Sequence, residues 1–341
     1  MILLQKKNLI EEKEKISNSI LSWVRSHERF LNVISLPYNS SDIFLKAIQY
    51  CVESRKNVIY ITNEDSSNIN ILETIKKYTN FRDYTYVRNE KTNLQSKLKV
   101  SSFNNALLIN EKFDLVIYDD IRSFPIHSKY EIFDLITKVS KADSKFITYS
   151  IENILKGGRE ISLPVKDSKN PIIEPRTILT RININRDIPF VVYEYLKWSI
   201  DCERRVVICV PDEEKIENVY FYINNYCRSL SKNIVCIPKG KVTKKVIINF
   251  EKIKRAVLIT NDFEQVFSGV NDSDVMVYFA NDSEFNYKKL IYFCGSVGRC
   301  EKDWKGEVIF LSNEESEDME KAKNITRNFN KEAWEMGLLK I

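Results

Sequence analysis

Glycine is scarce in this sequence and is unevenly distributed. The chain has 341 residues and eight glycines, and none of the glycines lies in residues 1–156. A phosphate-binding P-loop needs glycines for its unusual backbone angles and a lysine that reaches the phosphates. The first part of the chain therefore cannot contain a P-loop of the usual composition.

Metal ligands are equally sparse. The two histidines, His27 and His127, are far apart in the sequence, and no two of the seven cysteines are spaced as CxxC. Because a structural zinc site needs clustered ligands, we expect no zinc. Cysteines in apolar runs, such as Cys209 in VVICVP, are typical of small core residues in a reducing compartment.

The chain also lacks long apolar runs and a strong net charge. No run approaches the ~20 residues that a membrane-spanning helix needs. The charged N-terminal stretch MILLQKKNLIEEKEK does not resemble a signal peptide. We therefore expect no membrane span and a cytoplasmic location. With 52 basic and 47 acidic residues the net charge is +5, which is compatible with a polyanion partner but does not require one.

Short β-branched runs alternate with longer amphipathic stretches. The runs are apolar almost throughout, which is typical of parallel strands that are covered on both faces. They lie at residues 57–62, 115–118, 145–150, 205–210, 233–238, 256–260, 275–280 and 307–312. Helical stretches such as SDIFLKAIQYCVES lie between them. This repeated βαβ pattern predicts an α/β architecture with parallel sheets.

A connector divides the βαβ series into two halves. The stretch KGGREISLPVKDSKNPIIEPRT, which starts at residue 156, contains two glycines, three prolines and many charges. We therefore predict a helical N-terminal segment, a first α/β domain, a linker, a second α/β domain and a C-terminal helix. The predicted bounds are 1–29, 30–155, 156–180, 181–312 and 313–341.

Two aspartates follow a buried strand in the first half. In FDLVIYDD (113–120), Asp119 and Asp120 stand at the carboxyl end of the strand. Ligands bind at that edge in open α/β folds, and a strand-end aspartate often holds Mg²⁺ in nucleotide hydrolases. The alternative is a solvated strand end, because aspartates commonly begin turns.

The loop after the first strand is the place where a P-loop would lie. It reads PYNSS (37–41), and the next helix begins with Ser40, Ser41 and Asp42. The free amides at a helix start could face an anion. However, serine and aspartate there are ordinary N-caps, and Asp42 would repel a phosphate. The sequence therefore favours capping over phosphate binding.

The segment CGSVGR (294–299), followed by GEVIFL, resembles the last motif of superfamily-2 helicases. More closely, it is similar to the motif GRVGR of the competence helicases called ComFA. Other segments resemble that family in the same order. They are LKVSSFNNALL (98–108), LVIYDDIRSFP (115–125), LPVKDSKNPIIEPR (163–176), RVVICVP (205–211) and LITNDFEQV (258–266). The resemblance covers roughly residues 9–338.

The resemblance implies two tandem RecA-like domains, with ATP in the cleft between them and single-stranded DNA across the top. In the family, such a protein moves DNA during natural transformation, so competence or DNA-processing proteins are potential partners. Gly298 and Arg299 belong to the last motif, whose arginine stabilises charge on the transferred phosphoryl group. Ser101 and Ser102 match positions that contact the sugar-phosphate backbone.

The sequence departs from the family where ATP would bind. PYNSS replaces the P-loop GAGKT, so Ser40 and Ser41 stand in the loop without the phosphate-binding lysine. The adenine-reading glutamine and the four-cysteine zinc module of the family have no counterpart. A charge-assisted contact such as lysine to phosphate contributes roughly 1.5–3 kcal/mol. Its loss argues against useful ATP turnover.

The acidic motif and the arginine motif are altered as well. Asp119 survives at the metal-linked position and would hold Mg²⁺ only if nucleotide binds. Asp120 is a shortened substitute for the catalytic base, and Arg122 reverses a charge. Ser296 replaces the first arginine of the last motif, and an arginine finger can contribute about 10³–10⁵ in rate. We therefore expect no cofactor, and Asp119, Asp120 and Arg299 would be vestigial catalytic residues.

DNA binding is less affected, because it needs basic and polar groups along a groove but no hydrolysis machinery. Lys239, Lys241, Lys244 and Lys245 cluster in PKGKVTKK, just after a strand. The alternative for these lysines is a solvated loop.

Three functions remain open at this point. The leading hypothesis is a degenerate ComFA-like protein that binds single-stranded DNA in DNA uptake or processing and has lost ATP hydrolysis. The alternatives are an active translocase that uses Mg-ATP and a protein-interaction scaffold without DNA binding. An unrelated α/β metabolic enzyme is disfavoured, because the sequence has no dinucleotide fingerprint; a single α/β core would favour it.

Overall fold

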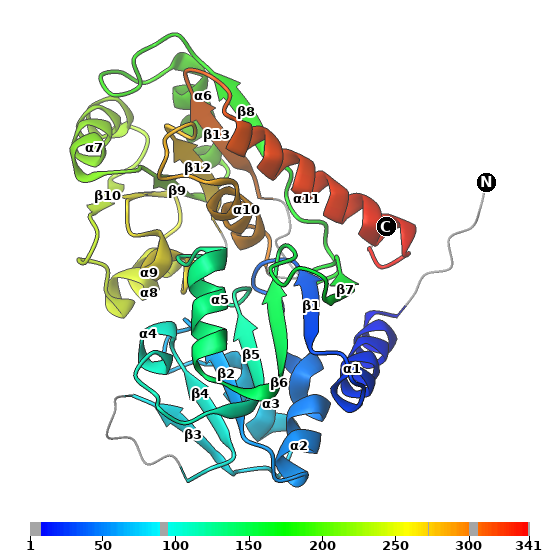
Figure 1. Cartoon of the computed structure of the whole chain (residues 1–341). Helices are drawn as coiled ribbons and strands as arrows, with labels where there is room; N and C mark the ends of the chain where they lie inside the picture. The colour runs from blue at the N-terminus through cyan, green and yellow to red at the C-terminus, as the bar shows by residue number, and fades with distance from the viewer. Residues whose placement is uncertain (1–7, 89–94, 272, 300–305, 340–341) are drawn as a thin grey trace. The chain divides into compact units, whose positions relative to one another are not determined.

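The computed structural model describes residues 8–339 except 89–94, 272 and 300–305. Two compact units divide the chain: the first comprises Met1–Lys169 and Glu332–Ile341, and the second comprises Asn170–Lys331. Each unit contains one parallel β-sheet, and helices lie between most successive strands (Figure 1). The prediction of two α/β domains with parallel sheets is therefore confirmed, and a single α/β core is excluded.

The first unit has a seven-stranded sheet in the order β3-β4-β2-β5-β6-β1-β7, and all its strand pairs are parallel. Its central strands are β-branched and aromatic runs that are buried on both faces. The bounds are β1 Phe30–Ser35, β2 Val58–Thr62, β3 Tyr84–Val87, β4 Leu98–Ser101, β5 Phe113–Asp119, β6 Ser140–Ser150 and β7 Arg159–Leu163.

Helices connect these strands, and several begin at polar caps. The side chain of Asn8 caps the first helix, and Ser128 with Glu131 forms a capping box at the fifth. The bounds are α1 Leu9–Arg25, the 3₁₀ turn η1 Asp42–Phe44, α2 Leu45–Glu53, α3 Asn70–Tyr78, α4 Phe103–Ala106 and α5 Lys129–Lys138.

The second unit has a six-stranded parallel sheet in the order β10-β11-β9-β12-β13-β8. Its strands are β8 Arg176–Leu179, β9 Arg205–Cys209, β10 Asn233–Ile237, β11 Ala256–Thr260, β12 Asp274–Tyr278 and β13 Val308–Ser312. Its helices are α6 Phe190–Asp201, α7 Glu213–Cys227, α8 Lys244–Lys252, α9 Phe263–Phe267 and α10 Tyr287–Ser296, and the C-terminal helix is α11 Glu317–Glu335.

The segment 156–180, predicted as a linker, is not structureless. It contributes β7 to the edge of the first sheet, next to β1, and β8 to the edge of the second, next to β13. Both strands carry charged, exposed residues, as edge strands commonly do. The unit boundary falls between them, at Lys169 and Asn170. The predicted terminal helical segments correspond to α1 and α11. Among the described residues, no helix is long and apolar enough to span a membrane.

Candidate functional site

The loop between β1 and η1 lies at the carboxyl edge of the first sheet, where open α/β folds bind ligands. In the absence of glycine, Tyr38 adopts the left-handed conformation, with φ +69°. Its N–H donates to the Ile121 carbonyl at 2.9 Å. A residue other than glycine is uncommon in this conformation, so surrounding contacts must hold the loop in place.

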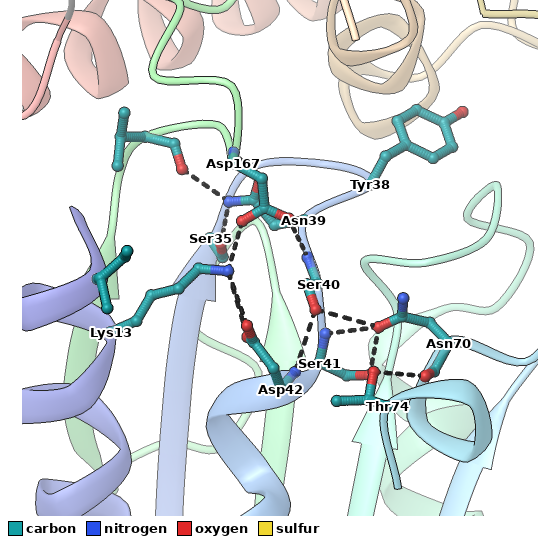
Figure 2. A network of polar contacts seen from close by, with 12 residues as sticks. Lys13, Ser35, Tyr38, Asn39, Ser40, Ser41, Asp42, Asn70, Thr74 and Asp167 are labelled. Atoms are coloured by element: carbon teal, nitrogen blue, oxygen red, sulfur yellow. Dashed lines mark hydrogen bonds and ion pairs between the residues drawn. The ribbon is translucent and has the colours of Figure 1, made fainter. Parts of the chain in front are cut away.

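Two backbone donors of this loop, those of Ser40 and Ser41, are bonded to side chains of the same unit (Figure 2). The Ser40 N–H donates to Asp167 Oδ2 at 2.8 Å, and the Ser41 N–H donates to Asn70 Oδ1 at 2.9 Å. The Ser41 hydroxyl donates to the same Asn70 oxygen at 2.8 Å. A carboxylate and an amide oxygen thus occupy the N–H groups that a phosphate would use.

The capping prediction for this loop is wrong for Ser41, the N-cap of η1, and Ser40 makes a local bond one residue before the cap. The Ser40 hydroxyl accepts a hydrogen bond from the Asp42 N–H at 3.3 Å. Ser41 is the N-cap of η1 but makes no side-chain cap bond, because its hydroxyl donates to Asn70. The α-helix itself starts one turn later, at Leu45.

Lys13, on α1, supplies the positive charge beside the loop. Its Nζ lies 2.7 Å from Asp167 Oδ1 and 3.1 Å from Asp42 Oδ2 (Figure 2). Burial alone would lower the pKa of Lys13, but the two carboxylates outweigh burial and raise this pKa above its ordinary value. Lys13 is therefore a cation whose charge two protein carboxylates already balance.

Asp119 is enclosed at the end of β5. Its side chain is 1% exposed, and the N–H groups of Ile121 and Arg122 donate to Oδ1 at 2.9 and 3.1 Å. The Tyr60 hydroxyl donates to Oδ2. The neighbouring Asp120 is also buried. Both oxygens of the Asp119 carboxylate thus accept hydrogen bonds within the unit, and its role toward Mg²⁺ stays a prediction.

Arg122 ties this strand end to the loop. Its guanidinium donates to the Tyr38 carbonyl at 2.5 Å and to the Asn39 carbonyl at 3.4 Å. Its Nε lies 3.1 Å from Oε1 of Glu64, whose side chain is 5% exposed. A cation therefore stands where the competence helicases that this sequence resembles have an acid, and a buried glutamate neutralises it. Burial raises the pKa of Glu64, and the guanidinium opposes that rise.

The ionisation of Asp119 should make the stability of the first unit depend on pH. Burial, reinforced by the charge of Glu64, raises the pKa of Asp119 to about 7. Because the folded state then holds a proton that the unfolded state has lost, stability should fall as pH rises from about 4 to about 7. Asp119→Asn cannot ionise. We therefore expect its unfolding free energy to decline less between pH 5 and 8, by about 1–2 kcal/mol.

Urea unfolding at both pH values measures this difference. The exposed Asp143, on β6, offers a control, and Asp143→Asn should keep the pH dependence of the parent protein. Parallel stability curves for the parent and Asp119→Asn would show that Asp119 does not titrate in this range.

Ser101 and Ser102, predicted to contact nucleic acid, have local structural roles. Ser101 is fully buried, and its hydroxyl donates to the Ser102 carbonyl at 3.0 Å. The Ser102 hydroxyl accepts from the Asn105 N–H at 3.3 Å and so caps α4. Each hydroxyl therefore has a hydrogen-bond partner within its own segment.

The last motif, residues 294–299, begins in the final turn of α10 in the second unit. Gly298 adopts the left-handed conformation, with φ +66°, which suits a glycine just after a helix. Arg299 donates to the Phe267 carbonyl at 3.0 Å and to Asn271 Oδ1 at 3.3 Å, at the end of α9. Ser296 is buried at the last position of α10.

The predicted lysine cluster begins in the loop after β10, at the carboxyl edge of the second sheet. This lysine loop, residues 238–243, is anchored from the end of β11 (residues 256–260). The Lys239 N–H donates to Asn261 Oδ1 at 2.7 Å, and the Gly240 N–H donates to Asp262 Oδ2 at 2.9 Å. Gly240 has φ +78°. Because these two amides are used internally, they are not available to an anion.

The lysines of this cluster are exposed. They are Lys239, Lys241, Lys244 and Lys245. The last two occupy the first turn of α8, which contains no acidic residue. Cations at a helix N-terminus oppose the helix dipole and cost about 0.3–1 kcal/mol each. A local cost of this kind is expected where the charges serve binding.

Sequence reasoning missed the residues that close the β1–η1 loop. They are Lys13, Glu64, Asn70 and Asp167. Glu64 carried a weak signal, because it follows β2 at the carboxyl edge. Asp167 carried none, because it reaches Ser40 from 127 residues further along the chain.

No protein-family model matches this chain. The chain is 22% identical over 230 residues to the competence protein ComFA of Bacillus subtilis (strain 168), an alignment that covers 63% of this chain. It spans about half of the length of that relative, 49%. The sequence resemblance to ComFA is thereby confirmed.

Solved helicase structures are similar to the whole chain. S. cerevisiae Dbp5 bound to RNA and ADP BeF3 is 11% identical, with a TM-score of 0.55, over 96% of this chain and 92% of that one. RecG bound to a three-way DNA junction is 13% identical, with a TM-score of 0.57, over 95% and 46%. The helicase MrfA bound to DNA is 13% identical, with a TM-score of 0.55, over 95% and 53%. The fold is therefore the tandem RecA-like fold of superfamily-2 helicases.

Proposed function

Because the chain is ComFA-like and has the superfamily-2 helicase fold, we propose that it binds single-stranded DNA without hydrolysing ATP. The solved neighbours include complexes with RNA and with DNA, which supports a nucleic-acid ligand. The ComFA likeness favours single-stranded DNA in uptake or processing, in the cytoplasm, with competence or DNA-processing proteins as partners.

The occupied β1–η1 loop is the observation that carries the loss of ATP hydrolysis. In P-loop nucleotidases, backbone amides and a lysine hold the phosphates. Here the amides of Ser40 and Ser41 are bonded to Asp167 and Asn70. A nucleotide would have to break these bonds and place its negative charge beside Asp42. The loss of the lysine alone removes roughly 1.5–3 kcal/mol of binding.

Nucleic-acid binding is assigned to the lysine loop and the first turn of α8. Four exposed lysines lie within residues 239–245: two are on the loop whose backbone is anchored by Asn261 and Asp262, and two are in the first turn of α8. Side-chain ammonium groups contact phosphates without reading bases, so the binding should have little sequence preference. It should weaken strongly as salt rises.

We expect Mg-ATP to leave the thermal unfolding of the protein unchanged. A ligand present at 100 times its dissociation constant adds about 2.7 kcal/mol of stability, which a melting curve detects easily. Millimolar Mg-ATP should therefore produce no measurable shift, and single-stranded DNA should stimulate no phosphate release. The Asp119→Asn variant is the control, and Mg-ATP should likewise leave its melting temperature and phosphate release unchanged. A shift or turnover that Asp119→Asn abolishes would contradict the proposal.

The active translocase remains the second candidate, favoured by the retention of Asp119 and Arg299 at their motif positions. It requires ATP to open the loop and displace Asp167. The ATP measurements above separate the two candidates. If the protein does not bind DNA at low salt, the alternative of a protein-interaction scaffold is favoured.

A further inference from the structure

The last segment of the first unit before the boundary, residues 163–169, is bonded to β1 and the loop after it by side-chain hydrogen bonds. The Ser35 hydroxyl donates to the Leu163 carbonyl at 3.2 Å. Asn39 Nδ2 donates to the Val165 carbonyl at 2.8 Å, and Asn39 Oδ1 accepts from the Asp167 N–H at 3.2 Å. Ser35 and Asn39 are both buried. The buried Asn39 side chain thus bonds to the backbone of two residues of this segment, Val165 and Asp167.

The Asp167 side chain completes this connection and links three parts of the unit. Its Oδ2 accepts from the Ser40 N–H at 2.8 Å, and its Oδ1 lies 2.7 Å from Lys13 Nζ (Figure 2). One carboxylate therefore joins α1, the β1–η1 loop and the outgoing segment. Lys13 also contacts Asp42, at the start of η1, so the same cation holds both sides of the loop.

The bond between Asp167 and Ser40 lies close to the boundary between the two units. The first unit ends at Lys169 and the second begins at Asn170, so Asp167 lies just before the boundary. A bond at this place fixes the backbone from which the second unit departs. In a nucleotide-driven protein, the same loop would change its contacts with the state of the nucleotide.

We propose that Asp167 is a positioning residue, an internal latch that holds the β1–η1 loop to the start of the inter-unit connector. The latch makes the loop and the connector exit one fixed structure whose geometry is set by the chain itself. It deepens the proposed loss of ATP dependence but does not rest on DNA binding. Ser40, Lys13 and Asn39 are its partners.

Hydrogen exchange tests the latch at the amides that it protects. In Asp167→Ala, the Ser40 amide and the amides of residues 163–169 should exchange roughly threefold to tenfold faster than in the parent protein. The effect is moderate because the Asp167 side chain is 41% exposed and its ion pair is weakened by solvent. Asp167→Asn keeps an acceptor for Ser40 but loses the charge, so its increase should be smaller. Exchange in β2 and β5 should stay as in the parent.

Glu14→Gln is the matched control. Glu14 is the next residue on α1, and it pairs with Lys46 of α2. It should leave exchange at Ser40 and residues 163–169 unchanged, whereas Lys13→Met should accelerate it as Asp167→Asn does.

Unchanged exchange at Ser40 and residues 163–169 in both Asp167 variants would overturn the latch. An equal acceleration throughout the first unit would also overturn it, because Asp167 would then contribute only general stability. If Asp167→Ala does not fold, Asp167→Asn decides the question alone. A failure to bind single-stranded DNA would refute the proposed function and leave the latch standing.

Discussion

Replacing Arg122 with methionine should lower the unfolding free energy of the first unit by about 3 kcal/mol. Glu64 would remain buried without a countercharge, and breaking such a pair costs about 3–5 kcal/mol. We expect the lower end, because the Arg122 side chain is 22% exposed. The bonds to the Tyr38 and Asn39 carbonyls would be lost as well.

The loss in Arg122→Met should be larger at pH 8 than at pH 5. The pKa of both Glu64 and Asp119 is raised by burial, and the guanidinium opposes that rise. Without the guanidinium, both pKa values rise further. At low pH the two carboxyls take up protons and the penalty disappears, whereas at high pH both must remain charged and buried. Urea unfolding, with exchange at the β1 and β5 amides as the local probe, measures the difference.

Two variants control this experiment. Arg122→Met/Glu64→Gln removes both charges and should recover more than half of the loss. Lys141→Met breaks the exposed pair with Asp114 and should cost less than about 1 kcal/mol. If Arg122→Met unfolds like Lys141→Met, the Arg122–Glu64 pair does not hold the strand end and the loop together.

Changing Lys241, Lys244 and Lys245 together to alanine should flatten the salt dependence of single-stranded DNA binding. Each neutralised phosphate on a single strand contributes about −0.7 to the slope of log K against log salt. If these three ammonium groups meet phosphates, the slope should lose roughly one to two units, and affinity at low salt should fall with it. Fluorescence anisotropy titrations at several salt concentrations give both quantities.

A second triple variant separates contact from net charge. Lys197, Lys232 and Lys254 are also exposed lysines of the second unit, but the last two precede β10 and β11 at the opposite edge of the sheet. Their replacement removes the same charge and should leave the slope unchanged. Equal effects from the two triple variants would show that Lys241, Lys244 and Lys245 are not in the binding site.

The strands that the sequence predicted are mostly those covered on both faces. The apolar runs at 57–62, 115–118 and 205–210 became β2, β5 and β9, because full burial leaves no room for polar residues. The runs did not include β1, β3, β4, β7 and β8, although β1 was recognised as the first strand from the loop that follows it. β3, β7 and β8 are sheet edges with exposed or half-buried residues, so their side chains lack a continuous apolar signal. β4 is buried, but it has only four residues and one of them is Lys99, so its apolar signal is short and interrupted.

The sequence predicted where the β1–η1 loop lies in the chain but not which residues bond to it. Together with the family resemblance, the missing glycines and lysine of the β1–η1 loop predict an altered nucleotide site, and this stays a prediction. What closes that loop was not predictable, because Asp167 and Lys13 approach it from distant parts of the chain. The role of Asn70 also depends on the fold, since its amide oxygen meets Ser41 only when α3 packs beside the loop. Contacts of this kind leave no periodic pattern in a sequence.

A salt titration with single-stranded DNA, performed with and without Mg-ATP, tests the central claim most directly. We expect binding at low salt, a linear fall of log K with log salt, and the same affinity and slope with and without ATP when free Mg²⁺ and ionic strength are matched. Binding that Mg-ATP strengthens or releases would contradict it, because the nucleotide would then reach a loop whose donors are bonded to Asp167 and Asn70. An absence of binding at low salt would contradict the nucleic-acid function itself.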